Sequence, residues 1–193
     1  MLKEANRLMA NAYKHFVMRD FTYIFSGGLV LGSARYAYDG QLLAGLEYVT
    51  ASVLTFVVFL GCAYYVGLIA QEGASFVGIM KTDSGVGVSK WIPTLDAFES
   101  KYKEEGLVRL ERIIYFKHVG SALGSCAMLS AVILLIHLIT DYTLIEFIAV
   151  LTLVIAAAVC LKLNRRAYRD QSSVLKPFVA EPGTGNEALS AKA

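Results

Sequence analysis

The chain has 193 residues and a formal net charge of +2 at neutral pH. Hydrophobic residues make up 56% of it, charged residues make up 18%, and the mean hydropathy is +0.53. A soluble domain is about 45–50% apolar and about 25% charged, so an ordinary soluble globule and a disordered chain are both excluded. The small net charge also excludes nucleic acid as a direct main partner.

Residues 1–20 are polar and amphipathic. Leu8, Tyr13 and Phe16 recur at helical spacing, and Lys3 and Lys14 supply a basic side. This pattern predicts a helix that lies at the cytoplasmic surface of a membrane.

Four apolar segments follow, and each has roughly the 20 residues that a helix needs to cross a bilayer. They are residues 21–38, 42–70, 119–139 and 144–163. The sequence therefore predicts an all-α, polytopic membrane protein with four transmembrane helices, arranged as two hairpins over 21–70 and 119–163. The first segment is at the short limit for spanning, so a re-entrant or buried amphipathic helix is its alternative.

The basic residues predict the orientation of these spans. All Lys and Arg except Arg35 lie before residue 20, in the connection 71–118, or from residue 162 onward. Because Lys and Arg concentrate on the cytoplasmic side, we expect a multi-pass protein of the inner membrane with both termini in the cytoplasm.

A polar cluster is expected at the outer ends of the spans. Arg35 and Glu47 are equally far from the first turn, and His137 and Glu146 are equally far from the second, so each pair can meet across its hairpin. The predicted outer cluster comprises Arg35, Asp39, Glu47, His137, Asp141 and Glu146. Simple anchoring, pH sensing by His137, and an acidic ring that attracts cations in an oligomer are its alternative roles.

Small residues predict close helix packing inside the membrane. Gly28 and Gly32 in the first span, and Gly120 and Gly124 in the third, match the small-xxx-small pattern. Such packing serves contacts within one chain as well as contacts between chains. Four short spans enclose little space, so any polar conduit would lie between subunits rather than inside one. We therefore expect a homo-oligomer.

The cytoplasmic parts are predicted to be a loop over 71–118 that contains an amphipathic helix after Pro93, and a tail over 164–193 that is largely disordered beyond Phe178. Gly106 is expected to bend or break that helix, which can run on into the third span. Basic side chains predicted to contact the inner leaflet or a partner are Arg109, Arg112, Lys117, Arg165, Arg166 and Arg169.

No motif for catalysis, metal binding or a cofactor is found. The three cysteines lie singly within the predicted spans without a C-x-x-C pair, and no H-E-x-x-H or G-x-S-x-G is present. We therefore expect a non-enzymatic protein without catalytic residues, metal ligands or cofactors.

The layout of residues 1–170 resembles small four-span subunits of bacterial anti-phage systems, in particular the Kiwa membrane component KwaA. The resemblance rests on architecture: four spans, cytoplasmic ends, outer turns at Asp39-Gly40 and Thr140-Asp141, and a basic connection ending at Lys117. It carries no motif and assigns no functional residue. It implies a membrane sensor or anchor that recruits a cytosolic protein partner in phage defence. The alternatives are a cation-permeable pore, and a small transporter or membrane-embedded lipid enzyme.

Overall fold

The computed structural model describes residues 2–40, 52–81 and 88–179, with side chains from residue 17 onward except at 88, 89, 91, 92, 103 and 104. Every regular element in these ranges is helical, so the predicted all-α class is confirmed. The elements are α1 (Leu2–Asp39), α3 (Val53–Phe76), α4 (Val88–Thr140), α5 (Leu144–Leu175) and the 3-10 helix η1 (Lys176–Phe178).

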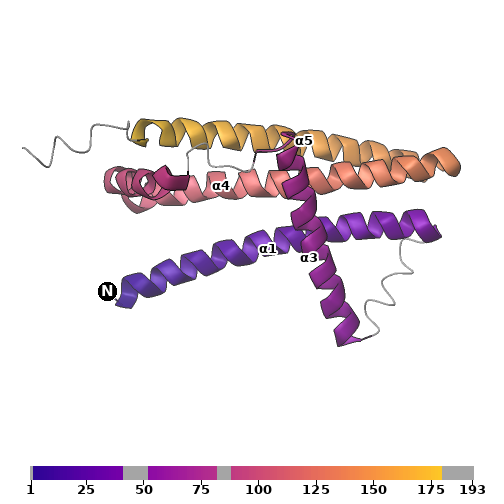
Figure 1. The fold of residues 1–193 in the computed structure, drawn as a ribbon, viewed down its shortest axis with the longest axis horizontal. Coiled ribbons are helices and arrows are strands. Elements are labelled where there is room, and N and C mark those ends of the chain that lie inside the picture. Colours follow the sequence, from indigo (N-terminus) through magenta and orange to yellow (C-terminus); the bar gives the residue numbers. More distant parts are fainter. Residues whose placement is uncertain (1, 41–51, 82–87, 180–193) are drawn as a thin grey trace, which may run out of the picture.

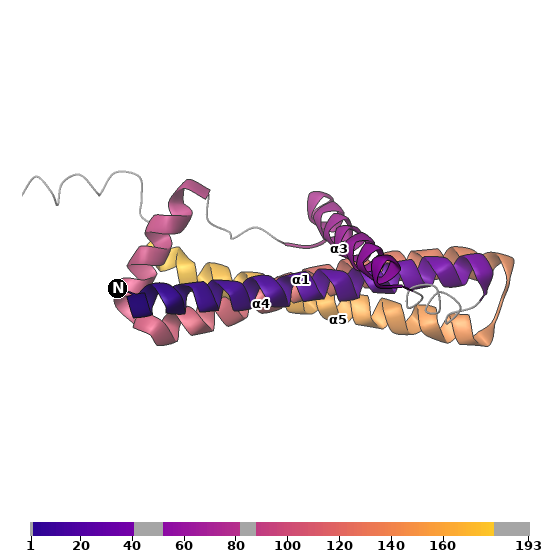
Figure 2. The ribbon, with the colours of Figure 1, turned by 90° about the horizontal axis from the view of Figure 1, so that it is seen from below.

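Three long helices lie side by side and a fourth crosses them (Figures 1 and 2). α1 and α4 run in the same direction, α5 returns antiparallel along α4, and α3 crosses α1 steeply. Asp39 and the α4–α5 connection lie at one end of this bundle, here named the turn end. The first residues of α4 and the last residues of α5 lie at the other, here named the cap end.

The second predicted hairpin is present. α4 ends at Thr140, and the Asp141 N–H donates to the His137 carbonyl over 2.9 Å. Thr143 then caps α5, since its hydroxyl accepts from the Glu146 N–H. A threonine cap satisfies one of the free N–H groups that begin a helix, which explains why the turn falls here.

The first predicted hairpin differs from the structure. The expected surface helix and first span form the single helix α1, which ends where Gly40 adopts a φ of +70°. α3 begins at Val53, capped by Ser52, and crosses α1 instead of running back along it. The start of the predicted second span, residues 42–51, lies outside the described residues.

Three helices in the described ranges are long and apolar enough to cross a membrane: Val53–Phe76, Glu105–Thr140 and Leu144–Phe178. The expectation of four spans is therefore corrected, because α1 is not among them. Its segment 21–38 contains Arg35 and is interrupted by glycine, serine and tyrosine, which lower its hydropathy below that of a typical span.

The connection 71–118 is mostly helical rather than a loop. α3 continues to Phe76, and α4 has 53 residues and runs from Val88 into the apolar segment 119–139. Its first turns fold at an angle to the remainder at the cap end (Figure 2). α5 likewise continues to Leu175 and is followed by η1, so the part of the predicted tail up to Phe178 is helical.

Gly106 is the position that the bend in α4 requires. A Cβ at this glycine would collide with the Cβ of Tyr102 and come within 3.3 Å of Cε1 of Phe98. Only glycine, which lacks a Cβ, fits such a close approach. The expectation that Gly106 bends the helix is therefore confirmed.

The bend creates a small hydrophobic core at the cap end. Phe98, Leu110 and Leu175 are buried together, and the Phe178 ring lies 5.3 Å from the Phe98 ring, measured between centroids. Apolar side chains of α3 and α5 instead remain largely exposed over the apolar segments, as a lipid environment favours.

Candidate functional site

A buried charged pair joins α4 and α5 at the turn end. Nδ1 of His137 lies 2.9 Å from Oε1 of Glu146, and the Glu146 side chain is only 2% exposed. The two groups are within ion-pair distance, and Nδ1 of His137 makes no hydrogen bond within the described part of the chain. The structure thus places together the two residues that the symmetry of the hairpin predicts.

Tyr36 of α1 joins this pair, and sequence analysis missed it. Its ring lies against the His137 ring with centroids 6.2 Å apart, and its hydroxyl interacts with Glu146 and Thr143. The three helices α1, α4 and α5 therefore converge on one polar cluster, made of Tyr36, His137 and Glu146 and named here the turn-end cluster. The sequence feature that could have indicated Tyr36 is an aromatic residue within one turn of the helix end at Asp39-Gly40.

Among the described residues, no ion pair joins the other predicted outer residues to the turn-end cluster. Arg35 pairs with Asp39 one turn along α1, and Glu47 lies outside the described residues. Asp141 is exposed in the connection. Because Glu146 is buried against His137 and Asp39 is paired with Arg35, the described part of one chain presents only Asp141 as an open outer carboxylate, which gives the acidic-ring alternative little support.

Asn164 of α5 makes the principal long-range polar contact of the structure. Its Oδ1 accepts from the Lys81 N–H, and its Nδ2 donates to the carbonyls of Lys81 and Lys117, each over 2.9 Å. The side chain is fully buried. Asn164 therefore fastens the segment after α3 onto the α4–α5 pair, a role that the sequence did not indicate.

Lys117 contradicts its predicted role at the inner leaflet or a partner. Its side chain is 2% exposed, so neither lipid headgroups nor a partner can reach it. The cause is its face on α4: Lys117, Gly120 and Gly124 are spaced at three and four residues and turn together toward α5. The distribution of Lys and Arg along the sequence indicates where a span ends, but it does not indicate which face of α4 carries Lys117.

The two polar levels are separated by a membrane-like distance. Lys117 and His137 stand 20 residues apart on α4, which corresponds to roughly 30 Å of helix. The hydrocarbon core of a bilayer is about 30 Å thick. The Asn164 contacts and the turn-end cluster therefore fit the two borders of one bilayer.

Basic side chains surround the cap end beyond the Asn164 level. Arg109 and Arg112 of α4 and Arg165, Arg166 and Arg169 of α5 are exposed, as predicted. Only Arg166 has a nearby acidic partner among the described side chains, with its Nε 4.0 Å from Oδ2 of Asp170. We name these five arginines the basic collar.

The predicted glycine contacts are found in one helix pair and shifted in the other. A Cβ at Gly120 would lie 3.0 Å from the Cys160 carbonyl oxygen, and one at Gly124 would meet Cβ of Cys160 at 3.0 Å, so both serve the α4–α5 contact. Gly32 has nothing within 4 Å, and Gly28 reaches only the Phe59 ring.

Gly27 makes the close approach on α1 instead. A Cβ there would collide with the Ala63 carbonyl, and a Cβ at Gly67 would collide with the Tyr23 carbonyl. The α1–α3 contact is thus a reciprocal one between small residues. It lies one residue away from the predicted register.

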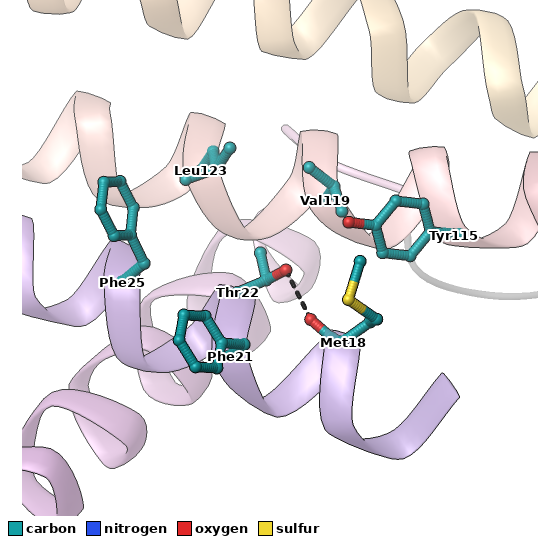
Figure 3. Close-up of a pocket in the computed structure, with 7 residues that line it drawn as sticks. All are labelled: Met18, Phe21, Thr22, Phe25, Tyr115, Val119 and Leu123. Carbon is teal, nitrogen blue, oxygen red and sulfur yellow. Dashed lines mark hydrogen bonds between the residues drawn. The ribbon is translucent and has the colours of Figure 1, made fainter. Parts of the chain in front are cut away.

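A shallow apolar groove runs between α1 and α4 on the cap-end half of the bundle. It has a volume of about 230 Å³, and Met18 and Tyr115 face each other at one end while Phe25 and Leu123 lie at the other (Figure 3). Its remaining walls are Phe21, Thr22 and Val119. The Thr22 hydroxyl donates to the Met18 carbonyl over 2.9 Å, and the Tyr115 hydroxyl is the other polar side-chain group of the lining (Figure 3).

Within the described residues, no group of three or more histidine, cysteine, aspartate or glutamate side chains comes close enough to hold a metal ion. Comparisons with protein families, with curated proteins and with solved structures find no match for this chain. The arguments on function therefore rest on the chain's own residues.

Proposed function

We propose that the chain is a non-enzymatic, oligomeric subunit of the inner membrane that anchors a cytosolic protein at its cap end. The observation that carries this proposal is the folded cap: α4 bends at Gly106 and packs Phe98 against Leu175 and Phe178, beyond the level of Asn164. A helix that ended at the membrane surface would need no such core.

The basic collar supports a cytoplasmic location of the cap end and binding of a protein partner there. Arginines concentrate on the cytoplasmic side of membrane proteins, which favours a cytoplasmic cap end. Exposed guanidinium groups bind carboxylates through paired hydrogen bonds. A partner with an acidic surface is therefore the chemistry that fits the basic collar.

Lipid-facing α3 supports the oligomer. Its apolar segment is only 11% buried within one chain, and its free face carries large side chains such as Leu54, Val57 and Val58. In an assembly, part of this face packs against a second copy and the rest meets lipid. Chemical crosslinking of the intact chain in native membranes measures the copy number.

The test of the anchoring role is capture of the cytosolic partner by the full-length protein in mild detergent. Arg165→Glu/Arg169→Glu is expected to abolish capture, because it reverses two charges of the basic collar. Arg165→Lys/Arg169→Lys keeps the charge and is the matched control, and it should retain capture at low salt. Equal capture by the wild type and the reversed variant would overturn the proposal, provided that both variants melt like the wild type.

A further inference from the structure

The groove between α1 and α4 opens sideways at the depth of lipid chains. We propose that it holds one acyl chain of an anionic phospholipid from the leaflet at the cap end, with the phosphate at Arg112. This proposal needs the membrane placement of the chain but not a cytosolic partner.

The dimensions of the groove fit a lipid chain of one leaflet. Tyr115 and Leu123 mark its two ends on α4 and stand eight residues, or roughly 12 Å, apart along the helix. One leaflet contributes about half of the 30 Å hydrocarbon core. Tyr115 lies close to the Lys117 level in sequence, so the groove starts at the border of the bilayer and runs toward its middle.

The walls of the groove are apolar and open to lipid. Phe21 and Phe25 are 68% and 70% exposed, and they stand beside the groove on α1. A soluble ligand would need polar partners to fix its orientation, whereas a hydrocarbon chain needs only the contact area that these rings supply. The apolar lining therefore favours a lipid chain over a polar metabolite.

Charge complementarity identifies the headgroup. Arg112 stands three residues before Tyr115, on the same face of α4 as Tyr115 and Val119, and its side chain is exposed. No acidic side chain in the described ranges forms an ion pair with it. A phosphate at this end of the groove therefore meets a guanidinium, the preferred partner of phosphate oxygens.

The experiment uses the full-length protein in vesicles of phosphatidylcholine that contain a small fraction of photoactivatable lipid. The probe is phosphatidylglycerol with a diazirine in one acyl chain, compared with phosphatidylcholine that carries the same chain. Crosslinks are mapped by peptide mass spectrometry. We expect the phosphatidylglycerol probe to label residues 18–25 and 115–123 more strongly than the phosphatidylcholine probe does.

Two variants and one control distinguish binding of the lipid headgroup from binding of the acyl chain. Arg112→Gln is expected to reduce the preference for phosphatidylglycerol by on the order of fivefold, the effect of one interfacial cation on an anionic lipid. Val119→Phe should reduce labelling by both probes, because it fills the groove. Arg169→Gln removes the same charge from α5, which does not line the groove, and should leave the labelling unchanged.

Three outcomes would overturn the proposal: labelling spread evenly around the apolar surface, an unchanged preference in Arg112→Gln, or crosslinks between the groove residues of two copies, which would show a protein interface there. Loss of partner capture in the Arg165 and Arg169 variants with intact groove labelling would separate the two proposals. Intact partner capture together with loss of groove labelling would also separate the two proposals.

Discussion

Individual buried polar side chains carry much of the specificity of this structure. Glu146 is almost fully buried and depends on His137, while Asn164 is fully buried and pairs only with backbone groups. Removing one member of a buried pair leaves the other without compensation, and this costs more than the pair itself contributes.

The His137–Glu146 pair is testable by a double-mutant cycle. His137→Ala is expected to lower the free energy of unfolding at neutral pH by about 3–5 kcal/mol, because Glu146 then stays buried without its partner. His137→Ala/Glu146→Ala should lose less than the sum of the two single variants. Equilibrium unfolding in mixed micelles measures all four proteins.

The control cycle uses Arg166 and Asp170, an exposed pair on α5 separated by 4.0 Å. Its coupling is expected to be at most about 0.5 kcal/mol. If the two cycles gave equal coupling, the turn-end pair would have no special role in stability.

The sequence predicts some of these residues and misses others for a definite reason. His137 and Glu146 are found because a hairpin aligns residues equally far from its turn. Tyr36 and Asn164 are not found, because their partners belong to α1 and to the segment after α3, whose placement depends on tertiary packing. Lys117 is misassigned because its burial depends on the face of α4 that meets α5.

At the scale of helices, apolar windows locate the spans but not the ends of the helices. α1, α4 and α5 all continue from apolar into polar sequence without a break, so hydropathy marks only their middle portions. The four-span expectation fails at α1 because Arg35 and the glycine, serine and tyrosine residues of 21–38 lower the hydropathy of that helix. The small residues of α1 likewise predict a close helix contact, but they do not show which glycine makes it.

The register of α1 on α3 is testable with two alanine variants of one helix. Gly27→Ala is expected to cost about 1–3 kcal/mol, because the added Cβ collides with the Ala63 carbonyl and the helices must separate. Gly32→Ala has open space and should be neutral or stabilise the helix by up to about 1 kcal/mol. Thermal unfolding in detergent compares them, and a larger loss for Gly32→Ala would refute the observed register.

For the molecule as a whole, the attachment of α3 is the feature that departs most from two simple hairpins. α3 contacts α1 through Gly27 and Gly67, and its following segment is held to α5 by Asn164. Met80 is buried beside this contact, where its Cε approaches Gly124. The crossing helix is thus fixed both to α1 and to the α4–α5 pair.

Asn164→Ala should release this attachment. Three hydrogen bonds are lost, two of them to the backbone of Lys81, so we expect a loss on the order of 3 kcal/mol. Hydrogen exchange at the Lys81 amide should accelerate most, because that N–H donates to Asn164. Thr152→Ala, whose exposed hydroxyl donates only within its own helix, is the control and should change little. An unaltered Lys81 exchange rate would show that Asn164 does not hold the segment.

Between Gly106 and His137, α4 is one uninterrupted helix of roughly 45 Å, given its rise of 1.5 Å per residue. Such a helix behaves as a stiff lever, so a tilt of about 5° at one extremity displaces the other by roughly 4 Å. A tilt of α4 at His137 would by the same geometry displace Arg109 and Arg112 at its far extremity. The intervening span needs no rearrangement of its own.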